Sequence, residues 1–418
     1  MENKYIKAKE ILKKYNQEQL LLNYEKFNNN EKEKLLNQII SIDFELMNKL
    51  YKEIDNKEEK EQEKVEPISY TDKNLLNDEE KKHYEELGIK EIKDGKLAAV
   101  TMAGGQGTRL GHDGPKGTFM LDIEPKKSLF QILCESLKEK NEKYNVIIPW
   151  YIMTSKENNQ QTVEFFEKNN YFNYPKGYIK FFVQGEIPMV TTEGKIILDE
   201  NGFVKFASDG HGGIFEAMFK NNVVEDMKNK NIEWIFIGPI DNPLVKMIDE
   251  IFIGIAKEKN ALAIGKSLVK ANPDEKVGVF CKKNGRPSVI EYTEISKELA
   301  NKRDEKGNLV FAESHINCNM FNIKAIELIG NNKLPYHSAF KKAKYLDENG
   351  NLIIPEEPNC YKFESFIFDS FNKMEDMAIL RVNREEEFAP VKNKTGVDSA
   401  ETAKELYIKY QLSKNNNK

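Results

Sequence analysis

Short apolar runs alternate with helical patterns between residues 96 and 266, and this alternation constrains the fold more than any other feature of the sequence. A short apolar run that ends in glycines favours a buried parallel strand. The predicted strands are 96–102, 147–154, 179–184, 232–240 and 261–266, and the predicted helices are 129–138, 155–168, 213–227 and 244–259. Strands that alternate with helices predict an α/β domain with a mainly parallel sheet.

The two ends of the chain have other patterns. Residues 5–54 predict two helices, because apolar residues recur at steps of three and four and the asparagines at 28–30 interrupt them. Residues 56–64 form a charge run that is typical of a solvated helix end or a linker. Asn284-Gly285 stands between two β-rich runs and predicts a hairpin. The C-terminal residues end in a helix followed by a polar tail.

We expect three parts from these patterns: an N-terminal helical region at 1–95, a central domain at 96–385 and a small C-terminal domain at 386–418. Apolar residues make up 39% of the 418 residues, enough for a large core and incompatible with wholesale disorder. The chain has 63 basic and 68 acidic residues, a net charge of −5, which argues against a general nucleic-acid binder.

The cysteines indicate a reducing compartment. Four of them lie far apart, without a C-x-x-C pair, so neither a zinc cluster nor a redox pair is expected: Cys134, Cys281, Cys318 and Cys360. The polar N-terminus carries no secretory signal, and no apolar run approaches the roughly 18 residues of a membrane span. We therefore expect a soluble, cytoplasmic protein without a membrane partner.

A glycine-rich stretch at 103–116, AGGQGTRLGHDGPK, follows the first predicted strand directly. Gly104 and Gly105 allow backbone N–H groups to approach a phosphate chain, as does Gly107. Arg109 and Lys116 add cations that suit phosphate oxygens. The stretch is neither a Walker A sequence nor a dinucleotide fingerprint, and by itself a tight turn with surface cations is an equally good interpretation.

The segment AGGQGTRLG, with PKG shortly after it, resembles the signature of the eukaryotic-type UDP-sugar pyrophosphorylases, and most closely that of the UDP-N-acetylglucosamine pyrophosphorylases. Further motifs follow in the order of that family: MTS at 153–155, QG at 184–185, DGHGG at 209–213, IDNP at 240–243, VGV at 277–279, EYTEIS at 291–296, FESFIFD at 363–369 and REEEFAPVKN at 384–393. The resemblance implies a Rossmann-like, doubly wound mixed sheet. It also implies an enzyme that joins UTP to a sugar 1-phosphate and releases pyrophosphate.

The resemblance assigns the phosphates and the nucleotide to particular residues. It implies catalytic cations at Arg109, Lys116 and Lys392, and a nucleotide site at Met102, Ala103, Gly104, Gly105, Gln184, Gly210, Asp241 and Lys362. A side-chain amide such as that of Gln184 matches the acceptor–donor edge of uracil. Taken singly, Lys362 and Lys392 are indistinguishable from solvated surface lysines.

Asp241 has two interpretations. It follows a predicted parallel strand, where α/β proteins bind ligands, and its carboxylate can hold Mg²⁺ or Mn²⁺ between phosphate oxygens. Alternatively, it caps a helix that begins near Pro243. The resemblance favours the metal.

For the sugar, the resemblance implies contacts from His211, Gly278, Glu291, Phe366 and Phe368, together with Asn317 or Asn319. The two phenylalanines are expected to alternate on an extended segment and face one side, although core packing explains most pairs of this spacing.

His211 departs from the asparagine that N-acetylglucosamine enzymes carry in this motif, and G-H-G resembles the UDP-glucose pyrophosphorylases at this place. UDP-glucose or a range of UDP-sugars is therefore an alternative product. A non-catalytic UDP-sugar-binding protein is a rival of another class, and a glycosyltransferase is disfavoured because its D-x-D metal motif is not apparent. Oligomeric state does not follow from the sequence.

Overall fold

The computed structural model describes residues 1–55, 64–330 and 332–416. Most of the charge run at 56–64 lies outside the described residues. The chain forms two compact units. The small unit consists of Met1–Gln62, Gly185–Gly213 and Leu334–Phe366, and the large unit consists of Glu63–Gln184, Ile214–Lys333 and Ile367–Lys418. The three-part division expected from the sequence groups the chain differently and stays a prediction about domains.

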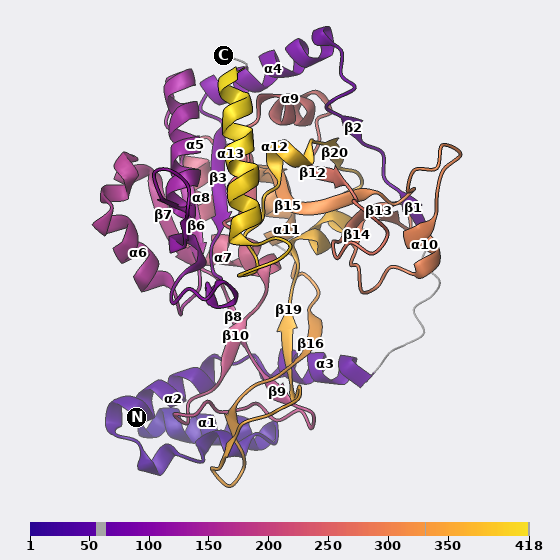
Figure 1. Ribbon diagram of the computed structural model, residues 1–418. Coiled ribbons are helices and arrows are strands. Elements are labelled where there is room, and N and C mark those ends of the chain that lie inside the picture. The colour runs from indigo at the N-terminus through magenta and orange to yellow at the C-terminus, as the bar shows by residue number, and fades with distance from the viewer. Residues whose placement is uncertain (56–63, 331, 417–418) are drawn as a thin grey trace. The chain divides into compact units, whose positions relative to one another are not determined.

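A mixed sheet forms the centre of the large unit (Figure 1). Its main path runs through β2 (Thr71–Asp72), β20 (Ala378–Arg381), β12 (Ala263–Val269), β15 (Glu313–Asn322), β11 (Trp234–Pro239), β3 (Leu97–Met102), β6 (Trp150–Thr154) and β7 (Ile179–Val183). The strands β11, β3, β6 and β7 are parallel, whereas β15 runs antiparallel to both of its neighbours. The prediction of an α/β fold with a mixed sheet is confirmed.

Three further strands join this sheet at one side: β1 (Val65–Pro67), β13 (Val279–Lys283) and β14 (Arg286–Ile290). The predicted hairpin is confirmed, because β13 and β14 pair antiparallel. Asn284 and Gly285 both have positive φ, 50° and 81°, as the two central residues of a type I′ hairpin turn require.

Helices of the large unit follow the strands in the predicted alternation, with different ends (Figure 1). Asn222 has a φ of 54° and separates α7 from α8, so the helix predicted at 213–227 is two helices. The α-helices are α4 (Asp78–Lys93), α5 (Leu129–Tyr144), α6 (Asn159–Lys168), α7 (Ile214–Lys220), α8 (Val223–Asn229), α9 (Glu250–Glu258), α10 (Lys297–Asn301), α11 (Ile323–Gly330), α12 (Arg384–Glu387) and α13 (Ala400–Asn416).

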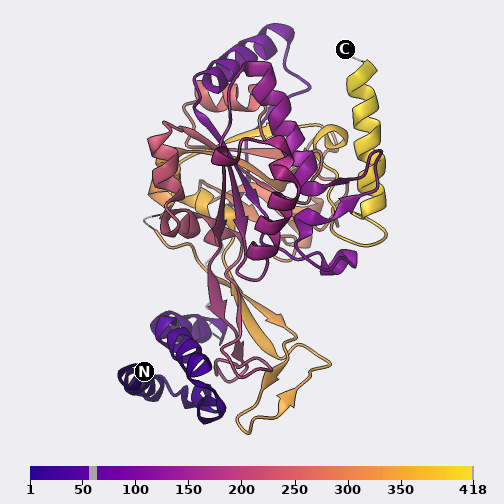
Figure 2. The same cartoon turned by 90° about the vertical axis from the view of Figure 1, so that its left-hand side faces the viewer.

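The small unit combines helices with short strands (Figure 2). The asparagine break is confirmed: Asn28 caps α2, and its side chain and that of Glu31 form a reciprocal capping box. The first of the two predicted helices already ends at Lys14, and a second break after Ser41 divides the other into α2 and α3. The elements are α1 (Glu2–Lys14), α2 (Asn29–Ser41), α3 (Phe44–Asp55), β8 (Glu186–Pro188), β9 (Val190–Thr191), β10 (Phe206–Ser208), β16 (His337–Lys341), β17 (Tyr345–Leu346), β18 (Leu352–Ile353) and β19 (Cys360–Glu364).

A buried ion cluster connects β12 to the start of α9 and the end of α12. Lys266 Nζ lies 2.8 Å from Asp249 Oδ2 and also contacts Glu387, and these three side chains are at most 4% exposed. Burial opposes the charged form of Asp249, but Lys266 and Lys73 hold its pKa well below the ordinary value. A buried charge that keeps its partners fixes the segments that carry them.

The helices α4 and α9 lie side by side and touch through two glycines (Figure 1). A Cβ added at Gly88 would lie 1.9 Å from the carbonyl oxygen of Glu250, and one at Gly254 would lie 1.9 Å from the carbonyl oxygen of Tyr84. Backbone cannot move aside as a flexible side chain can, so any larger residue must push the two helices apart.

We therefore expect Gly254→Ala to lower the free energy of unfolding by about 1–3 kcal/mol despite the higher helix propensity of alanine. Gly177→Ala is the matched control, because a Cβ there meets no atom within 4 Å. Chemical denaturation measures both variants. Equal stability of the two variants would contradict the close helix contact.

Candidate active site

The carboxyl ends of four parallel strands meet at one edge of the central sheet. Met102 pairs in register with Pro239 and with Met153, and Thr154 pairs with Val183. The residues that follow these strands therefore come to the same edge. They include the predicted site residues Ala103, Gln184 and Asp241.

The glycines of the loop after β3 have different neighbours. A Cβ at Gly104 would lie 2.5 Å from Oε1 of Gln184, so the loop packs directly on the residue predicted to bind the base. A Cβ at Gly107 would lie 2.8 Å from the side chain of His112. A Cβ at Gly105 would meet no atom within 4 Å, so only this one of the three faces open space.

The side chain of His112 bridges two parts of the same loop, a contact that the sequence analysis missed. The His112 Nε2 atom lies 2.7 Å from Thr118 Oγ1, which itself donates to Pro115 O. The imidazole N–H is therefore the donor to Thr118. Backbone bonds complete the closure, from Lys116 N to Gly105 O at 3.0 Å and from Gly107 N to Gly114 O at 2.9 Å.

Lys116 and Asp241, two of the predicted site residues, form an ion pair in the large unit. Lys116 Nζ lies 2.8 Å from Asp241 Oδ2, and the two side chains are 17% and 20% exposed. Arg109 of the same loop is exposed. A cation and a carboxylate thus stand together at the carboxyl edge of the sheet, within reach of solvent.

Asp241 does not cap a helix. Residues 243–249 are irregular, α9 begins at Glu250, and its cap is Asp249, which accepts a hydrogen bond from Phe252 N. The prediction of a helix from 244 is therefore wrong at its start, and the capping interpretation of Asp241 is wrong with it.

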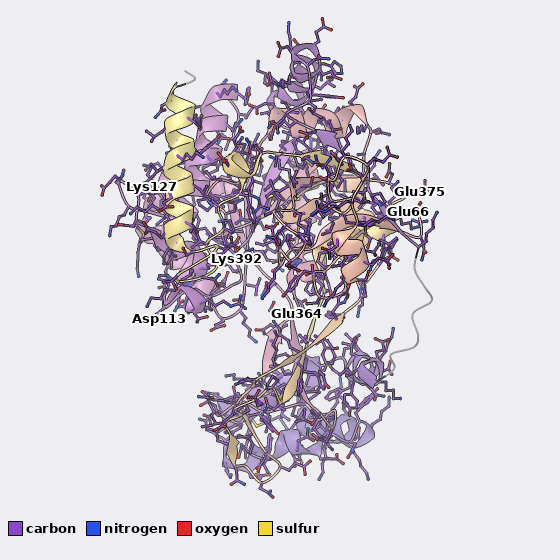
Figure 3. All side chains as sticks on the ribbon, turned by 45° about the vertical axis from the view of Figure 1, so that its right-hand side comes forward. Glu66, Asp113, Lys127, Glu364, Glu375 and Lys392 are labelled. Atoms are coloured by element: carbon purple, nitrogen blue, oxygen red, sulfur yellow. The ribbon has the colours of Figure 1, made fainter. Side chains whose placement is uncertain are left out.

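Asn242, which the sequence analysis left without a role, connects the Asp241 loop to the segment that leads to Lys392. Its side chain donates to Glu387 O at 2.6 Å and accepts from Ala389 N at 3.0 Å. Val391 N also donates to Asp241 O at 2.8 Å. Lys392, labelled in Figure 3, comes next in the chain and lies 3.5 Å from Asp398.

Several predicted sugar residues of the large unit gather around His315, which the sequence analysis missed. A Cβ at Gly278 would lie 2.9 Å from Oε1 of Glu291. His315 N donates to Gly278 O, its Nε2 lies within 3.3 Å of the Asn319 amide, and its ring meets that of Phe368 edge-on at 5.9 Å. A histidine within a run of strand residues gave no pattern that could have identified it.

The two candidate asparagines differ in their surroundings. Asn319 is fully buried and pairs with Ile237 inside the sheet. Asn317 lies at the irregularity between β12 and β15, with a φ of 57°, and its buried Oδ1 has no hydrogen-bond partner in the described structure.

Four predicted residues belong to the small unit. Gly210 has a φ of 86°, and a Cβ there would lie 2.3 Å from Ser365 O, so the protein itself requires glycine. The His211 ring lies 5.4 Å from that of Phe366, which stacks on His337 at 4.9 Å. Lys362 pairs at 2.6 Å with Glu364, labelled in Figure 3.

Phe366 and Phe368 do not alternate on an extended segment as predicted. The strand β19 ends at Glu364, and a 3-10 helix covers Ile367–Lys373. The boundary between the two compact units falls after Phe366. The two phenylalanines are not extended because the chain turns tightly after β19, and a two-residue spacing in the sequence cannot reveal such a turn.

Comparison with known proteins identifies the class of this chain. Residues 40–397 match the family described as UTP--glucose-1-phosphate uridylyltransferase. The chain is 36% identical over 359 residues to the UDP-N-acetylglucosamine pyrophosphorylase of Saccharomyces cerevisiae, an alignment that covers 83% of this chain and 75% of the yeast protein. It is 38% identical over 342 residues to the human UDP-N-acetylhexosamine pyrophosphorylase-like protein 1, covering 79% of this chain and 67% of the human one.

A solved structure agrees with these sequence matches. The uridine diphosphate N-acetylglucosamine pyrophosphorylase of Trypanosoma brucei, in complex with an inhibitor, superposes with a TM-score of 0.82 at 29% identity, over 97% of this chain and 84% of that one. Fold and matches together define a nucleotidyltransferase that acts on UTP and a sugar 1-phosphate. The chain belongs to the UTP--glucose-1-phosphate uridylyltransferase family. None of its described helices has the length and apolar character to cross a membrane.

Gly105→Ala tests whether the open space beside the glycine-rich loop holds the nucleotide. The added methyl group meets no protein atom within 4 Å, so folding should be unchanged. We expect the KM for UTP to rise about tenfold or more, because the methyl group occupies the approach to the loop. Steady-state kinetics and thermal denaturation check both points. An unchanged KM would place the nucleotide elsewhere.

Asp241→Asn tests the carboxylate at the sheet edge. Asparagine keeps an oxygen for Lys116 but removes the charge, so we expect a stable protein with turnover reduced about a hundredfold or more. Asp226→Asn is the control, since Asp226 of α8 also pairs with a lysine, Lys230. Near-normal turnover of Asp241→Asn would remove Asp241 from the reaction.

Proposed function

We propose that this uridylyltransferase forms UDP-N-acetylglucosamine and pyrophosphate from UTP and N-acetylglucosamine 1-phosphate. The observation that supports the proposal most strongly is the glycine-rich loop on the carboxyl edge of the sheet, where Lys116 meets Asp241 at 2.8 Å, in a chain of this family. The names of the yeast and trypanosome relatives supply the sugar.

The reaction needs no covalent enzyme intermediate. A phosphate oxygen of the sugar 1-phosphate attacks the α-phosphorus of UTP in line, and the new P–O bond forms as the bond to the pyrophosphate oxygen breaks. Pyrophosphate leaves with the electron pair. The enzyme's contribution is then to position two anions and to stabilise the charge that develops between them.

In this proposal each site residue of the large unit has its own role. Gln184 reads the uracil edge, and the backbone of residues 102–105 faces the base and ribose. Lys116 and Arg109 neutralise the triphosphate. Lys392 approaches the α-phosphate or the sugar phosphate, held by the backbone bond from Val391 to Asp241.

A divalent metal, Mg²⁺ or Mn²⁺, fits the donor set at Asp241. No group of three or more His, Cys, Asp or Glu side chains forms a metal site within the described residues. A hard cation that takes most of its ligands from phosphate oxygens and water needs no more than one carboxylate. Bound there, it would supply charge stabilisation at the phosphates.

UDP-glucose stays the second candidate product, because of His211. Its ring lies against Phe366, and an imidazole is larger than the amide of asparagine, so it leaves less room for an N-acetyl group. The other motifs that resemble the N-acetylglucosamine branch are more numerous than this one departure, so N-acetylglucosamine 1-phosphate stays the first candidate substrate. A non-catalytic binding protein is disfavoured because Arg109, Lys116, Asp241 and Lys392 are all present.

A pyrophosphate-release assay with UTP and a panel of sugar 1-phosphates tests the function. We expect the highest kcat/KM with N-acetylglucosamine 1-phosphate and a requirement for a divalent metal, with Asp241→Asn as the control of reduced turnover. A preference for glucose 1-phosphate would shift the assignment to the second product, and no release with any sugar would contradict catalysis.

His211→Asn tests how the sugar is selected. If His211 contacts the sugar, the ratio of kcat/KM for N-acetylglucosamine 1-phosphate over that for glucose 1-phosphate should change by about 1 kcal/mol, roughly fivefold, with the KM for UTP unaltered. A constant ratio, with both sugars slowed alike, would mean that His211 does not read the sugar.

A further inference from the structure

Asn158 is buried at the start of α6, and its side chain does not cap the helix as an asparagine at this position usually does. It stands at the N-cap but accepts no hydrogen bond from the first turn of the helix. Its Nδ2 instead donates to Ala103 O at 3.0 Å and to Gly105 O at 3.3 Å, both in the glycine-rich loop. The side chain thus joins the end of β6 to the loop that follows β3.

We propose that Asn158 is a positioning residue for UTP: it orients two peptide groups of the glycine-rich loop so that their N–H groups face the phosphates. The inference rests on the proposed function, because it concerns the same nucleotide site. It adds a residue that lies outside the loop itself and makes no contact with the substrate.

The geometry of the peptide bond carries the argument. Carbonyl and N–H point in opposite directions across a trans peptide, and the bonds after Ala103 and Gly105 are trans. Fixing Ala103 O towards Asn158 therefore turns the N–H of Gly104 away from Asn158. Gly105 O is held by Asn158 together with Lys116 N, which donates to it at 3.0 Å, and the N–H of Gln106 is turned away in the same manner. Within the described chain neither N–H donates to a backbone carbonyl. Two such N–H groups facing one side form an anion-binding arrangement.

Only an amide can accept the hydrogen bond from Ser155 N and also donate to the two loop carbonyls. Oδ1 of Asn158 accepts from Ser155 N at 2.8 Å, which fixes the amide with Nδ2 towards the loop. Both hydrogens of Nδ2 are then used by the two carbonyls. Aspartate would match the shape but would set a carboxylate oxygen against two carbonyl oxygens, so the peptide groups would have to rotate.

Asn158→Asp is the test, with Asn158→Ala as a second variant that adds no charge. Asn159→Asp is the matched control: it makes the same change one residue further on, and its carboxylate can still accept the bond that Thr154 Oγ1 now donates to Asn159 at 2.7 Å. Calorimetric titration of the full chain measures the affinities for UTP, UDP and UMP, and steady-state kinetics measure the KM for the sugar phosphate.

We expect Asn158→Asp to weaken UTP binding about thirtyfold and Asn158→Ala about tenfold, with smaller losses for UDP and the smallest for UMP. The KM for the sugar phosphate and all affinities of Asn159→Asp should stay within about twofold. A purely structural role would move the melting temperature and all nucleotides alike.

Equal losses for UTP, UDP and UMP, or equal effects of Asn158→Asp and Asn159→Asp, would overturn the inference while leaving the proposed function intact. Normal UTP affinity in Asn158→Ala would overturn it as well, even if Asn158→Asp fails to fold. Absence of UTP binding by the unmodified chain would overturn both.

Discussion

The parallel pairing of β3 with β11 is the interaction on which the proposed chemistry depends. Because Met102 lies opposite Pro239, the glycine-rich loop and the Asp241 loop leave the sheet at the same edge. Lys116 of the first loop can then meet Asp241 of the second. A shift of this register by one residue would turn the side chains of β3 to the opposite faces of the sheet and would separate the two loops. The buried strands that fix the register are therefore as important for the site as the loop residues themselves.

Buried polar contacts hold these loops in place. Asn242 fixes the segment before Lys392 to the Asp241 loop, and the ion pairs of Lys266 with Asp249 and Glu387 hold the same segment through Glu387. In the glycine-rich loop, Asn158 donates to Ala103 O and His112 donates to Thr118 Oγ1. Each of these groups sits where an unpaired polar atom would be costly, so the loops have few alternative conformations.

The sequence predicted the alternation of strands and helices and the hairpin at Asn284-Gly285, because each depends on residues that are close together in the chain. The anion-binding role of the glycine-rich loop stays a prediction. It did not predict that the helix of residues 244–259 begins only at Glu250, where Asp249 caps it while also pairing with Lys266. It also missed Asn158 and His315, whose contacts with Ala103 O and Gly278 O join residues far apart in the chain. Periodicity carries no information about such contacts, and the spacing of Phe366 and Phe368 suggested a strand where a tight turn prevailed.

A crystal structure of this chain with UTP and Mg²⁺ tests the account most directly. We expect the uracil against Gln184, phosphate oxygens within hydrogen-bond distance of the N–H groups of Gly104 and Gln106, and Asp241 beside the metal. A nucleotide bound away from the carboxyl edge of β3 and β11, or phosphates that leave these two N–H groups without an acceptor, would contradict it.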